Sequence, residues 1–387
     1  SSAFYIKNAS VNILGIYIRP TADVAYGVIA SSNYVTISSV SVDAAGKITT
    51  AGIRISSWSV ISYSSVTVTA AHGIYLDASN NNEIRYSTAV NNEGTTEYPI
   101  YLLNSKNNTF TDIYAKNGNA AGWALSVVNS DTNTVTRSYL EADDIGYSID
   151  ATSEFNTLSY STSIARGADW SAYFNWSADS NTIMYSYLQG NEGISFNNNC
   201  DYNTISFSTV VGMADGVNFN NSSKNLVSNS RITGFGNGGV GFTMSGSVPG
   251  SSSNTVVDSF IVNEVGRGLD ISQVAAVGNI VIRSTMIGGV SGDYGLYIDH
   301  AATTTVVDSY MAGGSAGVFS SGSTGTVIGG SVIVSTRTTK SALIFSNGNV
   351  NVSLTSSTIK GGSASPAVAI QIDPGNSGYI TLTSNTI

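Results

Sequence analysis

The stretch NTIMYS, residues 181–186, decides the fold, because it returns as NTISFS at residues 203–208. In both copies an Asn is followed two places later by Ile and five places later by Ser. The chain is therefore built from an internal repeat. The Asn position recurs at Asn33, Asn82, Asn108, Asn133, Asn156, Asn181, Asn203, Asn225, Asn254 and Asn279, and Thr304 and Thr326 take it later.

Each repeat has the period of β-strands. The position two places after the Asn is apolar, at Ile84, Phe110, Val135, Leu158, Ile183, Ile205, Val227, Val256, Val281 and Val306. The position five places after it is Ser, at Ser38, Ser87, Ser138, Ser161, Ser186, Ser208, Ser230, Ser259, Ser284 and Ser309. Alternation between apolar and polar residues, with Gly, Asn and Ser between the segments, is typical of short strands joined by turns.

Strands that recur in a fixed order predict an all-β parallel solenoid, in which each strand pairs with its equivalent one coil later. We expect one domain over residues 1–387, with about sixteen coils of about 24 residues. Coils about 4.8 Å apart would then form a rod of roughly 75 Å. In such a stack the inward Asn and Ser side chains form hydrogen-bonded ladders, so their role is structural.

The N-T-[IV]-x-x-S-x-[ILV] pattern resembles the right-handed parallel β-helix repeats of the pectate-lyase-like superfamily. More narrowly, it is similar to the generic repeats of NosD-type and surface β-helix proteins. The resemblance covers nearly the whole chain and implies a right-handed, single-stranded parallel β-helix. It does not choose an activity, because that fold carries lyases, hydrolases, epimerases, adhesins and surface fibres.

The composition narrows the partners. A net charge of −9 argues against nucleic acid, which needs a basic surface. No run of 18 apolar residues exists, so we expect no membrane-spanning helix. We expect an extracellular or cell-surface location. We also expect the chain to be a segment or subunit of a larger assembly, through neighbouring domains or end-to-end self-association.

Aromatic residues give the clearest binding signal. They stand four or six places after the Asn position, which we interpret as outward places on one long strand face. Flat rings on a rigid face suit sugar rings, which predicts a polysaccharide or other glycan as partner. The alternative is that Tyr and Phe stand there because they favour strands and because stacked rings stabilise each other. The predicted glycan-binding residues are Tyr63, Tyr86, Tyr114, Tyr139, Tyr160, Tyr185, Tyr187 and Phe207.

The candidate catalytic residues stand four places after the Asn position on three successive coils. They are Asp258, Arg283 and Asp308, whose charges alternate along the stack. An Arg base between carboxylates is similar to lyase sites of the superfamily. The alternative is a surface ladder of ion pairs, and Asp112 and Arg137 repeat the arrangement elsewhere.

The candidate metal ligands are Glu141, Asp143 and Asp144, which lie together in a predicted turn. The three carboxylates either bind calcium or are simply exposed to solvent at a turn. We expect no cofactor other than calcium. Asp299 and His300 are neighbours on a predicted strand, so their side chains should point to opposite faces. The stretch 288–296 partly matches a calcium-binding nonapeptide, but it occurs once where tandem copies are needed.

The sequence favours a structural or adhesive rod that binds glycans through its Tyr-rich face. The alternative is a polysaccharide lyase, hydrolase or epimerase with its site at Asp258, Arg283 and Asp308. A deep cleft walled by the loops at 234–253 and 288–294 would favour the enzyme. The sequence does not decide between the two functions.

Overall fold

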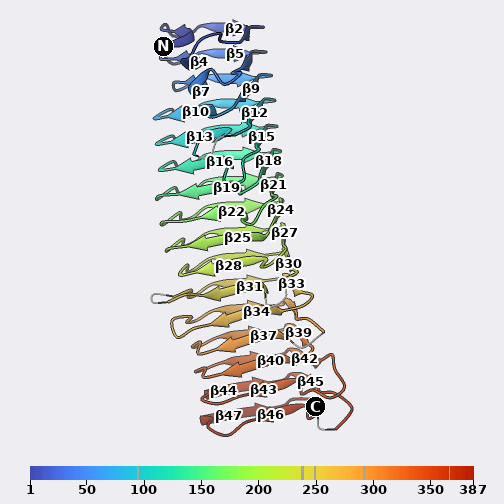
Figure 1. Ribbon diagram of the computed structural model, residues 1–387. Helices are drawn as coiled ribbons and strands as arrows, with labels where there is room; N and C mark the ends of the chain where they lie inside the picture. The colour runs from blue at the N-terminus through green and yellow to red at the C-terminus, as the bar shows by residue number, and fades with distance from the viewer. Residues whose placement is uncertain (94–95, 237–238, 248–249, 291–292, 366) are drawn as a thin grey trace. The chain divides into compact units, whose positions relative to one another are not determined.

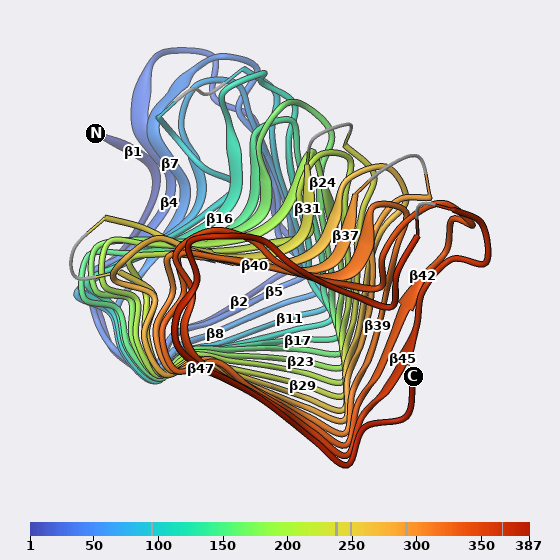
Figure 2. The ribbon, with the colours of Figure 1, turned by 90° about the horizontal axis from the view of Figure 1, so that it is seen from below.

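The computed structural model describes residues 1–93, 96–236, 239–247, 250–290, 293–365 and 367–387. This part of the chain is a parallel β-solenoid of about 15 turns, with three parallel sheets and no helix. Each coil before the last contributes one strand to each sheet, so such a coil has three sides (Figure 2). The predicted fold class is confirmed. No segment of the described chain forms a helix that could span a membrane.

The chain divides into two compact units, unit 1 (Ser1–Asn191) and unit 2 (Glu192–Ile387), and Figure 1 labels many of their strands. Within each unit the chain passes in turn through sheet A, sheet B and sheet C. Within a sheet, each strand pairs in parallel with its equivalent on the next coil. A single domain over residues 1–387 and end-to-end self-association stay predictions.

The strands of unit 1 are given in their order of pairing. Sheet A consists of β1 (Ser2–Ile6), β4 (Val24–Ala30), β7 (Ile48–Ile55), β10 (His72–Asp77), β13 (Ile100–Leu103), β16 (Trp123–Val128), β19 (Ile145–Asp150) and β22 (Trp170–Phe174). Sheet B consists of β2 (Asn12–Leu14), β5 (Thr36–Ser38), β8 (Val60–Ser62), β11 (Glu83–Arg85), β14 (Thr109–Thr111), β17 (Thr134–Thr136), β20 (Thr157–Ser159) and β23 (Thr182–Met184). Sheet C consists of β3 (Tyr17–Ile18), β6 (Ser41–Asp43), β9 (Ser65–Val68), β12 (Thr88–Asn91), β15 (Tyr114–Asn117), β18 (Tyr139–Ala142), β21 (Thr162–Ala165) and β24 (Tyr187–Gly190).

The strands of unit 2 follow the same order. Sheet A consists of β25 (Glu192–Asn197), β28 (Val217–Asn220), β31 (Val240–Ser245), β34 (Arg267–Ser272), β37 (Tyr294–Asp299), β40 (Ala316–Ser321), β43 (Leu343–Phe345) and β46 (Ile370–Ile372). Sheet B consists of β26 (Thr204–Ser206), β29 (Leu226–Ser228), β32 (Thr255–Val257), β35 (Ile280–Ile282), β38 (Thr305–Val307), β41 (Val327–Gly329), β44 (Val350–Thr355) and β47 (Ser377–Thr383). Sheet C consists of β27 (Thr209–Gly212), β30 (Arg231–Gly234), β33 (Phe260–Asn263), β36 (Thr285–Ile287), β39 (Tyr310–Gly313), β42 (Val332–Ser335) and β45 (Thr358–Lys360).

The core of each unit is made of columns of equivalent apolar residues. On sheet B of unit 1, Ile84 pairs with Phe110, which pairs with Val135, and all three are fully buried. These are the apolar positions two places after the repeating Asn. Because burial of such side chains contributes about 1.5–3 kcal/mol each, the repeated columns account for the stacking of the coils.

The buried asparagines hydrogen-bond from coil to coil. The backbone N–H and the side-chain amide of Asn108 both donate to Oδ1 of Asn133, at 2.9 and 3.0 Å. Asn82 donates to Asn108 in the same way, and the Asn108 amide also donates to the carbonyl of Ser79. Each Asn therefore satisfies buried backbone groups at the turn into sheet B.

One early coil departs from the register that the sequence predicts. Val35, and not Asn33, occupies the buried position before sheet B, where its N–H donates to Ser59. Likewise Val40 takes the place predicted for Ser38, and its N–H donates to Ser64. Asn33 is exposed. The predicted register is wrong by two residues on this coil, because Val residues occupy both the Asn position and the Ser position of the repeat.

Candidate functional site

The turn from sheet B to sheet C places one outward residue per coil in a left-handed backbone conformation. We call this set the turn column, and the φ angles of its members lie between 45° and 59°. Its N–H groups donate to the next coil, as Tyr86 does to the carbonyl of Thr111. The column therefore keeps register from coil to coil. It consists of Ser39, Tyr63, Tyr86, Asp112, Arg137, Tyr160 and Tyr185 in unit 1, and of Phe207, Asn229, Asp258, Arg283, Asp308 and Ser356, with Gly330, in unit 2.

A second set of outward residues begins the strands of sheet C, two places after the turn column. We call it the strand column, and its members pair directly across the sheet. It includes Thr88, Tyr114, Tyr139, Thr162 and Tyr187 in unit 1, and Thr209, Arg231, Phe260, Thr285 and Tyr310 in unit 2.

The predicted aromatic face is thus two columns, and one of them is not in a strand. Tyr63, Tyr86, Tyr160, Tyr185 and Phe207 belong to the turn column, whereas Tyr114, Tyr139 and Tyr187 belong to the strand column. The explanation by strand propensity is wrong for the first five. A bulky residue with positive φ is unfavourable, so the backbone gives no reason for an aromatic ring there.

Aromatic residues of the turn column of unit 1 form two stacked pairs. Tyr63 and Tyr86 have ring centroids 5.0 Å apart and planes 14° from parallel. Tyr160 and Tyr185 have centroids 4.9 Å apart and planes 7° from parallel. All four rings are exposed to solvent. Stacking of this kind contributes about 0.5–1.5 kcal/mol per pair, which offsets part of the backbone cost.

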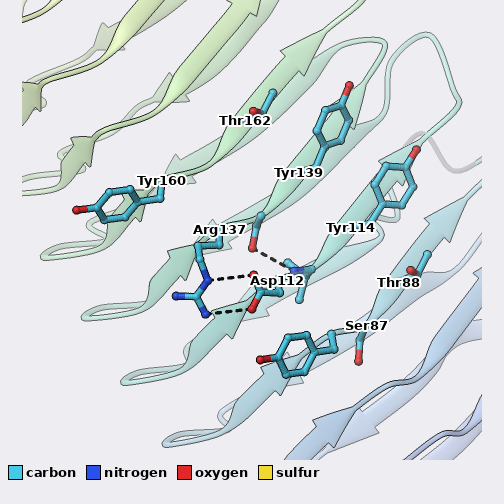
Figure 3. A pocket seen from close by; sticks show the side chains of 11 residues that line it. Ser87, Thr88, Asp112, Tyr114, Arg137, Tyr139, Tyr160 and Thr162 are labelled. Atoms are coloured by element: carbon cyan, nitrogen blue, oxygen red, sulfur yellow. Dashed lines mark hydrogen bonds and ion pairs between the residues drawn. The ribbon is translucent and has the colours of Figure 1, made fainter.

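Between these two pairs lies a shallow open groove of about 580 Å³ (Figure 3). Tyr86 lines it at one end and Tyr160 at the other, three coils away, which is about 14 Å along the stack. Tyr114 and Tyr139 form one side, with centroids 5.7 Å apart and planes 20° from parallel. Four of the eight predicted aromatic residues therefore meet in one groove.

An ion pair occupies the middle of the groove, in the turn column between Tyr86 and Tyr160 (Figure 3). Nε and Nη2 of Arg137 donate to Oδ1 and Oδ2 of Asp112, both at 3.0 Å. The hydrogen bond and charge of Asp112 raise the pKa of Arg137. From the sequence, Asp112 and Arg137 are recognisable only as a repeat of the charge arrangement of Asp258 and Arg283, and their place in a groove was not predicted. The available signal was that it shares the position of the tyrosines.

Glu141, Asp143 and Asp144 do not converge on a cation site. Glu141 lies on β18, where Nε of Arg166 (2.8 Å) and Nζ of Lys116 (3.1 Å) contact its Oε1. These contacts, led by the hydrogen bond from Arg166, lower the pKa of Glu141. The described residues contain no group of three or more His, Cys, Asp or Glu side chains that could hold a metal ion. Calcium dependence stays a prediction.

Asp144 instead belongs to a pair of carboxyl groups that sequence reasoning missed. It follows β18, and its side chain hydrogen-bonds to that of Asp169, which precedes β22. Burial and this hydrogen bond raise the pKa of Asp144 to about 7. Nε1 of Trp123 donates to Asp144 Oδ2 at 2.9 Å. Two carboxyl groups in contact must share a proton, and a value near neutrality suits acid–base chemistry.

Aromatic side chains continue from this carboxyl pair over sheet A. Tyr98 stacks on Trp123, with centroids 5.1 Å apart and planes 8° from parallel. Tyr101 meets Tyr98 edge-on, and His72 lies 4.7 Å from Tyr101. Burial lowers the pKa of His72 to about 4, so that its imidazole is neutral and its Nδ1 accepts the N–H of Tyr98.

The candidate catalytic residues of unit 2 lie in the turn column. Nε and Nη2 of Arg283 donate to both carboxylate oxygens of Asp258, at 2.7 Å each. Asp308, one coil further, acts on Arg283 through its charge. The hydrogen bonds that Arg283 donates to Asp258, together with the charges of Asp258 and Asp308, raise the pKa of Arg283. A base must give up its proton, so this geometry favours the ion-pair reading over an Arg base.

Asp299 and His300 contact each other, so the prediction that they point apart is wrong. Nδ1 of His300 lies 2.8 Å from Oδ1 of Asp299. β37 ends at Asp299, and His300 has a φ of 56°, which turns its side chain back. Both line a groove of about 390 Å³ with Arg267, whose guanidinium lies 3.6 Å from the centre of the Tyr297 ring.

Parts of the predicted cleft walls lie outside the described residues. The loop at 234–253 includes residues 237–238 and 248–249, and the loop at 288–294 includes residues 291–292. The stretch 288–296, which only partly matches a calcium-binding nonapeptide, includes residues 291–292 as well.

No known family model matches the sequence, and no curated protein matches it. Tailspike protein 3 of bacteriophage CBA120 matches the structure with a TM-score of 0.53 and 10% identity, over 90% of this chain and 56% of the tailspike. The periplasmic alginate epimerase AlgG matches with a TM-score of 0.49 and 10% identity, over 92% of this chain and 76% of the epimerase. A pentasaccharide-bound tailspike of E. coli bacteriophage HK620 matches with a TM-score of 0.44 and 10% identity, over 98% of this chain and 72% of the tailspike.

The first of these likenesses agrees with the arrangement of the strands. The chain has the right-handed parallel β-helix fold. It spans 56% of the length of the CBA120 tailspike.

Proposed function

We propose that this chain is an extracellular or cell-surface β-helix protein with a structural or adhesive role, which binds a polysaccharide through the groove of unit 1. The observation that carries the proposal is the grouping of four tyrosines around one ion pair in a groove of about 580 Å³. That volume falls in the range of about 300–1,000 Å³ that is usual for ligand sites.

The chemistry of the groove suits a sugar chain. Flat tyrosine rings offer apolar faces to the C–H groups of a pyranose, and their hydroxyl groups offer polar contacts. The ion pair adds donors, because Arg137 uses only Nε and Nη2 on Asp112 and keeps other N–H groups for a ligand. The groove is open along the stack, which suits a polymer.

Titration of the protein with neutral oligosaccharides tests the proposal. We expect Tyr139→Ala to weaken binding about tenfold, because it removes one ring of the stacked side. The matched control is Tyr34→Ala, which removes an exposed tyrosine of unit 1 that stacks on Trp58 outside the groove. Absence of binding across a broad panel, or equal affinities of the wild type and Tyr139→Ala, would refute it.

A second candidate function is that of an enzyme that cleaves or modifies a polysaccharide. The observation that favours it is the proton-sharing pair of Asp144 and Asp169 beside the rings of Trp123 and Tyr98. The test is the release of reducing ends or unsaturated products from acidic and neutral polysaccharides. Turnover that Asp144→Asn abolishes would support this candidate, and a wild-type protein without turnover would remove it.

A further inference from the structure

Unit 2 repeats the framework of the groove of unit 1 with different side chains. A groove of about 570 Å³ lies over its turn column and strand column. Asp258 and Arg283 form the same two-bonded ion pair as Asp112 and Arg137, on consecutive coils and in the same chain order. Phe207 supplies an exposed ring at one end.

The strand column marks the difference. Where unit 1 has Tyr114 and Tyr139 side by side, unit 2 has Arg231 and Phe260 on adjacent strands. The guanidinium carbon of Arg231 lies 4.7 Å from the centre of the Phe260 ring. A guanidinium held against a ring loses less freedom when it binds a planar anion.

Arg231 is also the cation of this groove that no carboxylate neutralises. Among the described residues, no Asp or Glu oxygen lies within 4 Å of its guanidinium. Arg283 has Asp258 as a hydrogen-bonded partner and Asp308 one coil beyond, so its charge is met within the turn column. In the groove of unit 1 the single Arg and the single Asp cancel.

We infer that the groove of unit 2 binds a sugar that carries a carboxylate or sulfate group, and that Arg231 contacts this group. The inference rests on the proposed function, because it assigns a sugar to a groove of the same build. A ring of the sugar would lie near Phe207 and Phe260, and its anionic group would accept two N–H bonds from Arg231. Each chain would then hold two ligands of different charge.

Isothermal titration of the full chain separates the two grooves. The probes are maltohexaose and cellohexaose as neutral sugars, and an oligogalacturonate and a heparin-derived hexasaccharide as anionic ones. We expect Arg231→Gln to weaken binding of an anionic probe about tenfold and to leave neutral probes unchanged. Raising the salt from about 0.05 to 0.5 M should weaken only the anionic probe.

Two controls keep the outcomes distinct. Arg19→Gln removes an exposed Arg of unit 1 that lies 3.6 Å from Asp43, and it should leave the affinity for anionic probes unchanged. Tyr139→Ala should weaken the neutral probes alone. The inference is overturned if no anionic probe binds, or if Arg231→Gln binds it as tightly as the wild type does. Loss of neutral binding with intact, Arg231-dependent anionic binding would remove the proposal for unit 1 and keep this one.

Discussion

Units 1 and 2 carry two grooves with one framework and different linings. In both, the groove is lined by left-handed residues of the turn column and by residues of the strand column two places later. Unit 1 fills the strand column with Tyr114 and Tyr139, and unit 2 fills it with Arg231 and Phe260. Buried residues therefore stabilise the coils in both units, whereas the turn column and the strand column can carry aromatic, acidic or basic side chains.

The interiors of the units differ as well. In unit 1, Asn133 satisfies its neighbours on both sides of the stack. In unit 2 the Asn column continues as far as Asn279. Thr304 and Thr326 then take this position, and their buried hydroxyl oxygens have no hydrogen-bond partner among the described residues. A Thr hydroxyl is too short to bridge two coils, whereas the Asn amide reaches the next one.

The largest expected effect is a loss of stability when the bonded Asn of the interior is removed. Asn133→Ala removes the acceptor of the Asn108 N–H and the donor to the Ser105 carbonyl, and leaves both groups buried. Since an unsatisfied buried group costs about 1–3 kcal/mol, we expect a loss of at least about 3 kcal/mol in the free energy of unfolding. Thr304→Ala should cost about 1 kcal/mol or less.

Chemical unfolding followed by circular dichroism measures both variants. Equal losses for Asn133→Ala and Thr304→Ala would show that the bonded Asn and the unbonded Thr contribute alike, against this account.

The second effect separates two titrating groups of unit 1 by their dependence on pH. The pKa of Asp144 rises on folding from 3.8 to about 7, so it contributes stability at low pH that is lost as pH rises from about 4 to about 7. The pKa of His72 falls on folding from 6.5 to about 4, so stability is gained as pH rises over about the same window. The two contributions have opposite signs.

Thermal midpoints at pH 4.5 and 7.5 test this opposition. Relative to the wild type, Asp144→Asn should be more favourable at pH 7.5 than at pH 4.5. His72→Gln should be more favourable at pH 4.5, because it removes a group that must stay neutral when buried. Difference curves of the same sign would contradict the assignment of Asp144 or of His72.

Much of the fold was predictable from the sequence because burial repeats at a fixed spacing. The buried column of Ile84, Phe110 and Val135 shows this spacing directly. The register of the coil with Val35 was predicted wrongly, because apolar residues stand there in place of the repeating Asn and Ser. The conformation of the turn column was not predictable, because residue types such as Tyr, Asp and Arg do not indicate a positive φ in the way that Gly does.

The candidate site was predictable in part for a related reason. The eight aromatic residues were found by counting from the Asn position, and four of them do line one groove. The contact of Asp144 with Asp169 depends on how two loops after sheet C lie on successive coils, which no local pattern records. The pairing of Asp299 with His300 depends on the last residue of one strand.

A third variant asks whether the rings of the turn column serve binding or stability. Tyr160→Asn removes a stacked ring, worth about 0.5–1.5 kcal/mol, and relieves a left-handed backbone cost of about 1–2 kcal/mol. These terms nearly cancel, so we expect the free energy of unfolding to change by less than about 1 kcal/mol. Affinity of the unit 1 groove for neutral oligosaccharides should fall severalfold. A large loss of stability with unchanged affinity would make Tyr160 a structural residue.

The smallest expected effect compares the two ion pairs. Arg137→Gln and Arg283→Gln each break an exposed pair with two hydrogen bonds, on the same column of different units. Pairs that water screens contribute little to folding, so the thermal midpoint should barely move in either variant. The variants should differ in binding, since Arg137 lines the groove that we propose binds neutral sugars and Arg283 lines the groove that we propose binds anionic ones. A marked fall of the midpoint in only one of them would show that the two turn columns are not equivalent, and the shared framework would then have to be abandoned for that unit.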